Sequence, residues 1–293
     1  MKLFAIDMDG TLLNEEGKIS RVNTEAIRQA QQQGVQVAIA TGRASYDAWI
    51  KLEEAGLAAP VIGANGATVH DTQRRQLTST PMYRDETFEV LNWLRENDFY
   101  YEVMTDRAIY SPQYGHQLLA VEMDRLLSAN PDISLNTLLH AAEKQYEQTG
   151  LIRITSYEDI PLDVEIYNVL CFSFDQAKLD RGRERYRGFH DLNMVISSDR
   201  NFEVEHKDAS KGNALRYLAN HLGIPMQETV AIGDSYNDIS MLTMAGKGIA
   251  MGNANDDIKA VCSEVTLTNV EDGVAHALLN ILKTVEAEAD IVN

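Results

Sequence analysis

Residues 3–40 read LFAIDMDGTLLNEEGKISRVNTEAIRQAQQQGVQVAIA, in which two apolar runs flank one helical stretch. The run Leu3 to Ile6 is continuously apolar and the run Val35 to Ala40 is apolar except for Gln36, which is typical of strands that are buried on both faces. The stretch from Ile19 to Gln33 has helical spacing, and Ser20 is suited to cap its N-terminus. This segment therefore predicts a β-α-β unit within a parallel sheet.

The same alternation continues beyond this segment. A helix is expected at Ala44 to Leu57 and a strand at Val61 to Ala64. Near the end of the chain we expect strands at Thr229 to Ile232, Gly248 to Met251 and Val265 to Leu267, a helix through Met244 and a last helix from about Glu271 to Glu286. The predicted fold class is α/β, with a Rossmann-like, doubly wound parallel sheet that is assembled from both ends of the chain.

The middle of the chain has a different texture, because helical stretches there are mixed irregularly with strand-like runs. Helices are expected at Asp85 to Glu96, His116 to Ala129, Leu135 to Tyr146 and Gln176 to Phe189, and strands at Tyr100 to Met104, Ile166 to Phe174 and Asn193 to Ser197. We predict an inserted α+β cap domain over residues 84–198, between core segments 1–83 and 199–293.

Composition narrows the class of protein. The 293 residues carry 26 lysines and arginines against 44 aspartates and glutamates, and the net charge of −18 repels phosphate backbones and anionic lipid headgroups. We therefore expect neither a nucleic-acid nor a membrane partner. Cys171 and Cys262 are too few for a disulfide framework. The sequence shows neither a signal-peptide pattern nor an apolar run of about 18 residues, which favours a cytoplasmic location.

The first candidate site is the acidic loop DMDGTLL, residues 7–13, directly after the first strand. Asp7 and Asp9 lie at the carboxyl end of that strand, where two carboxylates repel each other unless a cation stands between them. Hard carboxylate oxygens suit Mg²⁺, and Gly10 lets the chain turn away. For this pattern alone, an acidic turn that caps a helix is the alternative.

Two further segments offer groups to an anion. Thr41, Gly42 and Arg43 stand between a strand and a helix, where a hydroxyl and backbone N–H groups can bind an anion. Lys211, in DASKGNAL, stands at the start of another helix, where the helix dipole opposes a cation unless an anionic partner compensates. Taken singly, each segment also fits an ordinary loop or a surface lysine.

The second acidic segment is GDSYND, residues 233–238, which again follows a predicted strand. Asp234 and Asp238 are separated by a strand-to-helix turn and can reach one metal ion, while Asn237 offers an amide to an anion. Helix capping by Ser235 or Asp234 explains one or two of these residues but not the whole set. Together the four segments predict one site for a phosphoryl group and Mg²⁺.

These segments also resemble a known family. DMDGTLL, ATGR, SKGNAL and GDSYND, in this order and spacing, resemble the motifs of the haloacid dehalogenase superfamily of phosphotransferases. The long insertion, together with Asn65-Gly66, GIAMGNA and NVEDGVA, resembles the Cof-like, type IIB branch of that superfamily. The resemblance covers the outer core segments, whereas the insertion matches only by position and general pattern.

The resemblance implies a role for each matched residue. Asp7 would be the nucleophile that forms an aspartyl-phosphate, and Asp9 the general acid and afterwards the base. Mg²⁺ would be held by Asp7, the backbone carbonyl of Asp9 and Asp234, with Asp238 supporting it through water or from behind the ligands. The phosphate-binding set would comprise Met8 and Gly42 through their N–H groups, Thr41, Lys211, Asn237 and Thr11, which orients the acidic loop.

The predicted function is a Mg²⁺-dependent phosphatase for small phosphorylated metabolites, such as sugar phosphates, flavin-pathway intermediates, nucleotides or pyridoxal phosphate. An acid at position 9 favours a phosphatase, because a dehalogenase would not need one there. The alternatives are a phosphomutase or another phosphotransferase of the same superfamily, a regulatory phospho-acceptor resembling a receiver domain, and a non-catalytic phosphate-binding module. We expect a monomer or a small homo-oligomer.

Overall fold

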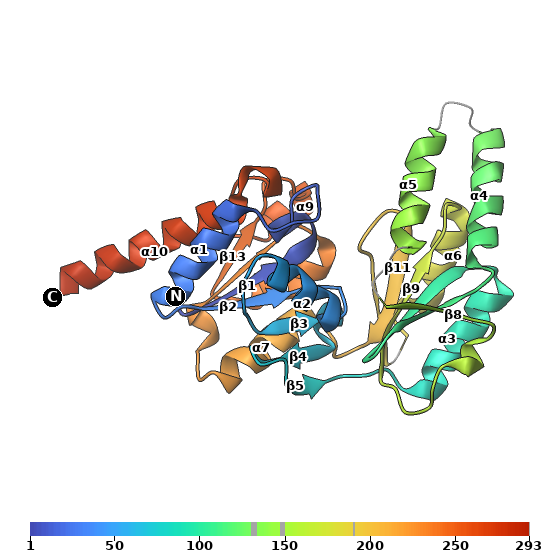
Figure 1. Cartoon of the computed structure of the whole chain (residues 1–293), viewed down its shortest axis with the longest axis horizontal. Helices are drawn as coiled ribbons and strands as arrows, with labels where there is room; N and C mark the ends of the chain where they lie inside the picture. Colours follow the sequence, from blue (N-terminus) through green and yellow to red (C-terminus); the bar gives the residue numbers. More distant parts are fainter. Residues whose placement is uncertain (130–133, 147–149, 190, 293) are drawn as a thin grey trace. The chain divides into compact units, whose positions relative to one another are not determined.

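The computed structural model describes residues 1–129, 134–146, 150–189 and 191–292, and the chain divides into two compact units (Figure 1). The core unit comprises Met1–Ser79 and Asp208–Asn293, and the inserted unit comprises Thr80–Lys207. The predicted boundary after residue 198 is wrong, because the following strand, β11 (Asn201–His206), pairs with β9 (Ile166–Phe172) inside the inserted unit. The first boundary lies at Ser79, close to the predicted residue 83.

The core unit is built on an eight-stranded sheet in the order β14-β13-β12-β1-β2-β3-β4-β5. Neighbouring strands from β14 to β3 are parallel. These parallel strands are β1 (Leu3–Asp7), β2 (Gln36–Ala40), β3 (Val61–Gly63), β12 (Thr229–Gly233), β13 (Lys247–Ala250) and β14 (Glu264–Val265). The antiparallel strands β4 (Thr68–His70) and β5 (Gln76–Ser79) extend one edge and were not predicted.

Helices cover both faces of this sheet. One face carries α1 (Arg21–Gln32), α2 (Ser45–Glu54) and α10 (Gly273–Val292), and the other carries α7 (Lys211–His221), α8 (Ile239–Met244) and α9 (Asp256–Ala260). In β1, Phe4 and Ile6 pack in the first layer, whereas Leu3 and Ala5 pack in the second. Burial on both faces explains the continuous apolar runs, and the predicted doubly wound α/β fold is confirmed.

The inserted unit has its own six-stranded sheet in the order β10-β11-β9-β6-β7-β8. Its neighbours are antiparallel except for the parallel pair β7 and β8. The remaining strands are β6 (Tyr100–Thr105), β7 (Ile109–Pro112), β8 (Leu151–Ile154) and β10 (Leu192–Val195), and the helices are α3 (Arg84–Glu96), α4 (Gly115–Ala129), α5 (Leu135–Tyr146) and α6 (Gln176–Tyr186). The short strands β7 and β8 were not predicted, and α6 ends earlier than expected.

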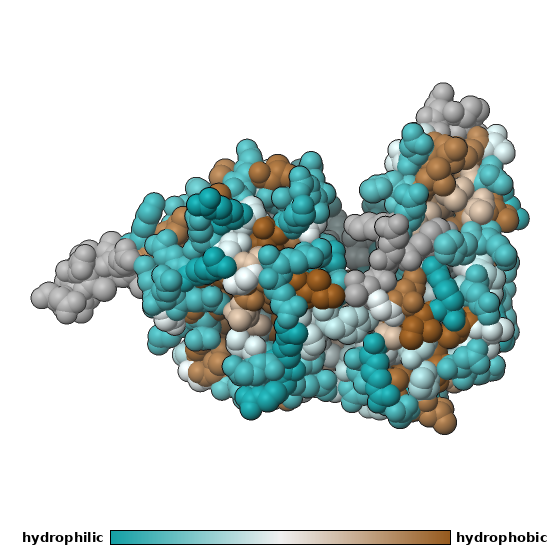
Figure 2. Space-filling view, in the orientation of Figure 1, coloured by the Kyte–Doolittle hydropathy of each residue, from teal (hydrophilic) through white to brown (hydrophobic). Residues whose placement is uncertain are grey.

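Helices also lie on both sides of the smaller sheet. Residues of α3 and α6 pack in one cluster with β6, β9 and β11, and residues of α4 and α5 pack in a second cluster with Tyr100 and Phe172. Helices α4 and α5 expose Val121, Leu135 and Leu139, and Figure 2 shows apolar surface over them at the upper right.

Within the described ranges, we find no helix long and apolar enough to cross a membrane.

Candidate active site

The carboxyl ends of three neighbouring strands bring the predicted residues together. Strand β1 lies between β12 and β2, with Ile6 level with Ile232 and Asp7 level with Ala40. Because these strands are parallel, the residues that end or follow them, Asp7, Thr41 and Asp234, lie along the same edge of the sheet. Three segments that are distant in sequence therefore contribute to one site.

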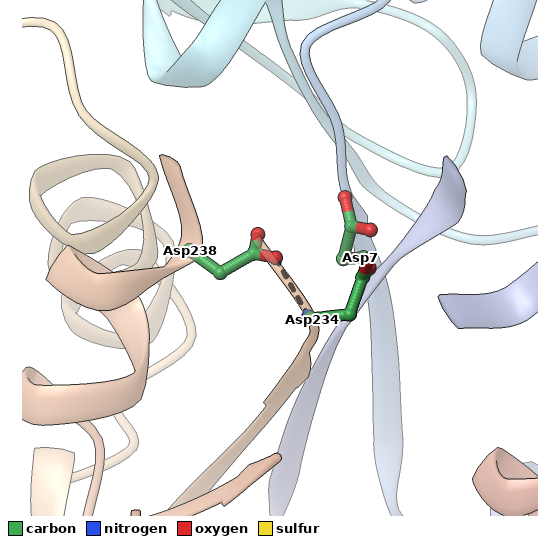
Figure 3. A group of neighbouring side chains, drawn as sticks. All are labelled: Asp7, Asp234 and Asp238. Atoms are coloured by element: carbon green, nitrogen blue, oxygen red, sulfur yellow. Dashed lines mark hydrogen bonds between the residues drawn. The ribbon is translucent and has the colours of Figure 1, made fainter. Parts of the chain in front are cut away.

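Three carboxylates form the centre of this site. Oxygen atoms of Asp7, Asp234 and Asp238 all lie within 4.8 Å of one another, and Figure 3 shows the three side chains grouped at the ends of β1 and β12. Asp238 is fully buried, and its Oδ2 accepts hydrogen bonds from the backbone N–H groups of Asp234 at 3.0 Å and Ser235 at 2.9 Å. The backbone thus holds Asp238 behind the other two carboxylates.

Lys211 is a buried cation beside these carboxylates. Its Nζ lies 2.6 Å from Oδ1 of Asp7 and 2.6 Å from Oδ1 of Asp238, and the residue is only 1% exposed. Burial disfavours the charged amine, but the carboxylates of Asp238 and Asp7 outweigh burial and raise the pKa of Lys211 above its ordinary value. The alternative of a surface lysine is therefore wrong, since Lys211 joins the start of α7 to both acidic segments.

The single positive charge of Lys211 does not balance the negative charges of the three carboxylates. Burial raises the pKa of Asp7 well above its usual range, repulsion from Asp238 raises it further, and Lys211 opposes both effects. Burial also raises the pKa of Asp234 to about 6, although the hydroxyl of Thr11 donates a 2.7 Å hydrogen bond to its Oδ1 and opposes the shift. A cluster of hard oxygen donors with excess negative charge is a fitting set of ligands for a divalent cation such as Mg²⁺.

Asp9 stands apart from this cluster. Its side chain is 47% exposed and forms two hydrogen bonds with the Arg43 guanidinium, from Nε to Oδ2 at 2.6 Å and from Nη2 to Oδ1 at 2.7 Å. Arg43 also pairs with Asp47 in the first turn of α2. The resemblance assigns the backbone carbonyl of Asp9, rather than its side chain, to Mg²⁺. This assignment stays a prediction.

The groups predicted to hold phosphate surround the same edge. Thr41 is fully buried, and its Oγ1 accepts the backbone N–H of Arg43 at 3.1 Å, which leaves the hydroxyl hydrogen to donate elsewhere. Asn237 donates from Nδ2 to Oδ1 of Asn65 at 3.1 Å. Met8 follows Asp7 and Gly42 follows Thr41, so their backbone N–H groups belong to the turns that carry those side chains.

Two glycines permit the close approach of these segments. Gly10 has φ +78°, and a Cβ built on it would lie 2.5 Å from Oδ2 of Asp234. Gly66 has φ +99°, and its Cβ would lie 2.2 Å from the carbonyl oxygen of Ser210, which precedes Lys211. A side chain at Gly10 would therefore displace the Asp234 carboxylate, and one at Gly66 would displace the backbone at Ser210 and Lys211.

Comparison with known proteins gives the family. A model of the haloacid dehalogenase-like hydrolases matches residues 4–278. The chain belongs to this family. This hydrolase is 48% identical over 287 residues to phosphatase YwpJ of Bacillus subtilis, across 96% of this chain and 100% of that protein. It is 41% identical over 283 residues to the 5-amino-6-(5-phospho-D-ribitylamino)uracil phosphatase YwtE of the same organism, across 96% and 98% of the two chains.

Solved structures agree with this placement. The hydrolase matches the structure of a haloacid dehalogenase-like hydrolase from B. subtilis with a TM-score of 0.84 and 48% identity, over 95% of this chain and 99% of that one. The predicted membership of the Cof-like, type IIB phosphatases is confirmed, and so is the enzyme class of a phosphatase.

Sequence reasoning missed two contributors to the site of this hydrolase. Arg43 was quoted in its motif without a role, although it binds Asp9 across 34 residues of chain. Asn65 was quoted only as part of the resemblance, although it accepts a hydrogen bond from Asn237. The adjacency of strand ends is the signal that could have found Arg43, since β1 and β2 were both predicted.

The raised carboxyl pKa values make the stability of the metal-free protein depend on pH. When the pKa of a carboxyl group is higher in the folded state than in the unfolded state, the folded state binds more protons. Protonation then stabilises the folded protein, and this stabilisation is lost as the pH rises through the folded pKa. For Asp234 the folded pKa is about 6. In EDTA, the melting temperature of Asp234→Asn minus that of wild type is therefore expected to rise by about 3 °C from pH 5 to pH 7.5. Thermal unfolding followed by circular dichroism measures this gain, and an offset that does not change with pH would contradict it.

Proposed function

We propose that this phosphatase hydrolyses monoesters of small phosphorylated metabolites, with Mg²⁺, through an aspartyl-phosphate on Asp7. One observation carries the proposal: Asp7 is a buried carboxylate at a strand end, held at 2.6 Å by Lys211 and grouped with two further carboxylates. Such a group has few structural uses, because burying several acids beside one cation is unfavourable unless a ligand completes the charge balance.

In the first step, an oxygen of Asp7 attacks phosphorus while the bond from phosphorus to the leaving-group oxygen breaks. Asp9 gives a proton to that leaving oxygen, so the product departs as an alcohol rather than an alkoxide. Lys211 fixes the orientation of the Asp7 carboxylate through its hydrogen bond to Oδ1, which leaves Oδ2 to attack. Thr41, Asn237 and the N–H groups of Met8 and Gly42 are assigned to the phosphoryl oxygens.

In the second step, Asp9 removes a proton from a water molecule whose oxygen attacks the same phosphorus. The bond between phosphorus and the Asp7 oxygen breaks, inorganic phosphate leaves, and the Asp7 carboxylate is regenerated. The proton that Asp9 gave in the first step is thereby replaced, so the enzyme returns to its starting state.

Asp7, Asp234 and the backbone carbonyl of Asp9 would hold Mg²⁺, with Asp238 behind them. A bound Mg²⁺ would neutralise repulsion between the anionic substrate and the carboxylates. Lys211 cannot do this alone, because both of its short contacts are to Asp7 and Asp238.

The relatives and the chemistry of the site support the proposed substrate class. YwtE is named for a phosphorylated ribitylaminouracil and shares 41% of its residues with this chain over the aligned length. We propose a small metabolite of this kind, and the compounds to test are 5-amino-6-(5-phospho-D-ribitylamino)uracil, sugar phosphates, nucleotides and pyridoxal phosphate.

The test is phosphate release from this panel and from p-nitrophenyl phosphate, in MgCl₂ and in EDTA. Turnover is expected in MgCl₂, with loss of activity in EDTA and recovery when excess Mg²⁺ is added. Undiminished turnover in EDTA would contradict the assigned metal. Transfer of the phosphoryl group between two hydroxyls without phosphate release would show a phosphomutase, and a long-lived phosphoenzyme with negligible turnover would show a phospho-acceptor.

A further inference from the structure

Arg43 holds the carboxylate of Asp9 by both oxygens. The guanidinium Nε lies 2.6 Å from Oδ2 and Nη2 lies 2.7 Å from Oδ1. This is the planar fork arrangement in which arginine matches a carboxylate, and it fixes the orientation of the carboxylate plane as well as its position. The two residues follow adjacent parallel strands, so the pair bridges the acidic loop and the segment after β2.

The backbone that carries Asp9 is irregular. The side chain is 47% exposed, and the turn that carries it, Met8–Leu12, contains non-helical backbone at Asp9 and Gly10. An exposed aspartate on such a turn would sample several rotamers. A fixed partner is therefore needed if this carboxylate is to transfer a proton along one direction.

Arg43 is itself held in place from a second side. Its Nη1 donates to Oδ2 of Asp47 on α2, and its side chain is only 27% exposed. Its own backbone N–H donates to Thr41, which ties the residue to the predicted phosphate-binding turn. The hydrogen bond with Asp9 and the charges of Asp9 and Asp47 raise the pKa of Arg43, so the fork stays charged.

We propose that Arg43 is a positioning residue that acts through Asp9, by presenting the Asp9 carboxylate to the leaving-group oxygen during proton transfer. Each carboxylate oxygen has two lone pairs, so Asp9 can remain bound to the fork and still exchange a proton through the second lone pair. Asp47 supports this role, because it holds the guanidinium of Arg43 in place. This inference rests on the proposed role of Asp9 as the general acid.

The experiment compares an alkyl phosphate, whose leaving group needs a proton, with 2,4-dinitrophenyl phosphate, whose leaving group departs without one. The measured quantity is the ratio of the two kcat/KM values, because kcat/KM covers the steps up to departure of the leaving group and uniform binding effects cancel in the ratio. Arg43→Lys keeps the charge but loses the fork. It is expected to lower kcat/KM roughly 100-fold for the alkyl ester and less than about 5-fold for the dinitrophenyl ester.

Two further variants test the route of the effect. Asp47→Asn is expected to shift the same ratio in the same direction by about 5-fold, because it frees one side of the guanidinium. In the Asp9→Asn background, Arg43→Lys is expected to add less than about 3-fold, since residues that act as one unit are non-additive. The matched control is Arg75→Lys, which alters another Arg–Asp pair, with Asp71 at 2.7 Å in the turn between β4 and β5, and should leave the ratio unchanged.

Each contrary outcome is distinct. If Asp9→Asn shifts the ratio but Arg43→Lys lowers both kcat/KM values equally, Arg43 acts on the phosphoryl group or on the fold, and the positioning role is overturned. If Asp9→Asn leaves the ratio unchanged, the general-acid role of Asp9 fails, and the inference fails with it. If the wild-type protein hydrolyses neither ester, it is the proposed function that fails.

Discussion

Replacing Asp7 with asparagine is expected to lower kcat by on the order of 10⁴-fold or more, without unfolding the protein. The amide has nearly the same shape as the carboxylate but cannot form the bond to phosphorus that the proposed first step requires. The position is 4% exposed and lies on β1 at the centre of the sheet, so an isosteric change avoids the cavity that alanine would leave. The measurement is phosphate release at saturating Mg²⁺.

We also predict how Asp7→Asn changes the melting temperature of the protein. Burial and repulsion from Asp238 raise the pKa of Asp7, so its charge is unfavourable in the metal-free folded state, although Lys211 compensates in part. Asp7→Asn should therefore melt within a few degrees of wild type in EDTA, while the rise in melting temperature that Mg²⁺ gives wild type should shrink. Loss of activity together with normal melting separates a chemical role from a structural one.

The matched control is Asp71→Asn, which exchanges a carboxylate for an amide in the turn between β4 and β5. It should keep full activity and the full Mg²⁺-dependent rise in melting temperature. Turnover of Asp7→Asn within about tenfold of wild type would remove Asp7 as the nucleophile, whatever its effect on stability.

The sequence predicted the strands that are buried on both faces of the sheet. Continuous apolar runs such as Leu3 to Ile6 can only be satisfied between two layers of helices, so they identified the parallel strands and therefore the edge where their polar residues meet. Asp7, Asp234 and Asp238 are predicted in this way, since each follows or ends such a strand. Their closeness follows from the strand order β12-β1-β2, which the alternation of strands and helices does not specify and the structure supplies.

Strands β4, β5 and β11 lack a continuous apolar run and were not predicted. Strands β4 and β5 have three and four residues, and their hairpin arises from antiparallel pairing that a parallel pattern does not predict. The residues of β11 were also placed in the wrong unit; its alternating sequence, NFEVEH, says nothing about which sheet it joins. The pairing with β9 is a long-range contact that only the fold reveals.

Side-chain partnerships were the least predictable feature. Lys211 gave a weak sequence signal, because a lysine at a helix start is common on protein surfaces. The backbone before it lies close to Gly66, and its amine pairs with acids that are 204 and 27 residues away in the chain. No local pattern contains that information.

Lys211→Met is the substitution from which we expect the largest loss of stability. Methionine fills a similar volume but leaves Asp7 and Asp238 buried without their common cation. Removing one partner of a buried ion pair costs about 3–5 kcal/mol, so the melting temperature in EDTA should fall by roughly 10 °C at pH 7.5. Because the folded pKa of Lys211 lies above its ordinary value of 10.5, the lysine is charged at pH 7.5, and the stability that its charge provides would be lost only at much higher pH.

A second buried lysine provides the matched control for this substitution. Lys178 pairs with Glu122 at 2.7 Å in the inserted unit, and both side chains are 8% exposed. Lys178→Met should also lower the melting temperature, but Mg²⁺ should not restore it, because Glu122 is not part of the carboxylate group. In Lys211→Met, by contrast, Mg²⁺ should recover part of the loss by neutralising Asp7, although catalysis should stay impaired because the orientation of Asp7 is no longer fixed. Equal recovery of both variants by Mg²⁺, or of neither, would contradict a shared site for Lys211 and the metal.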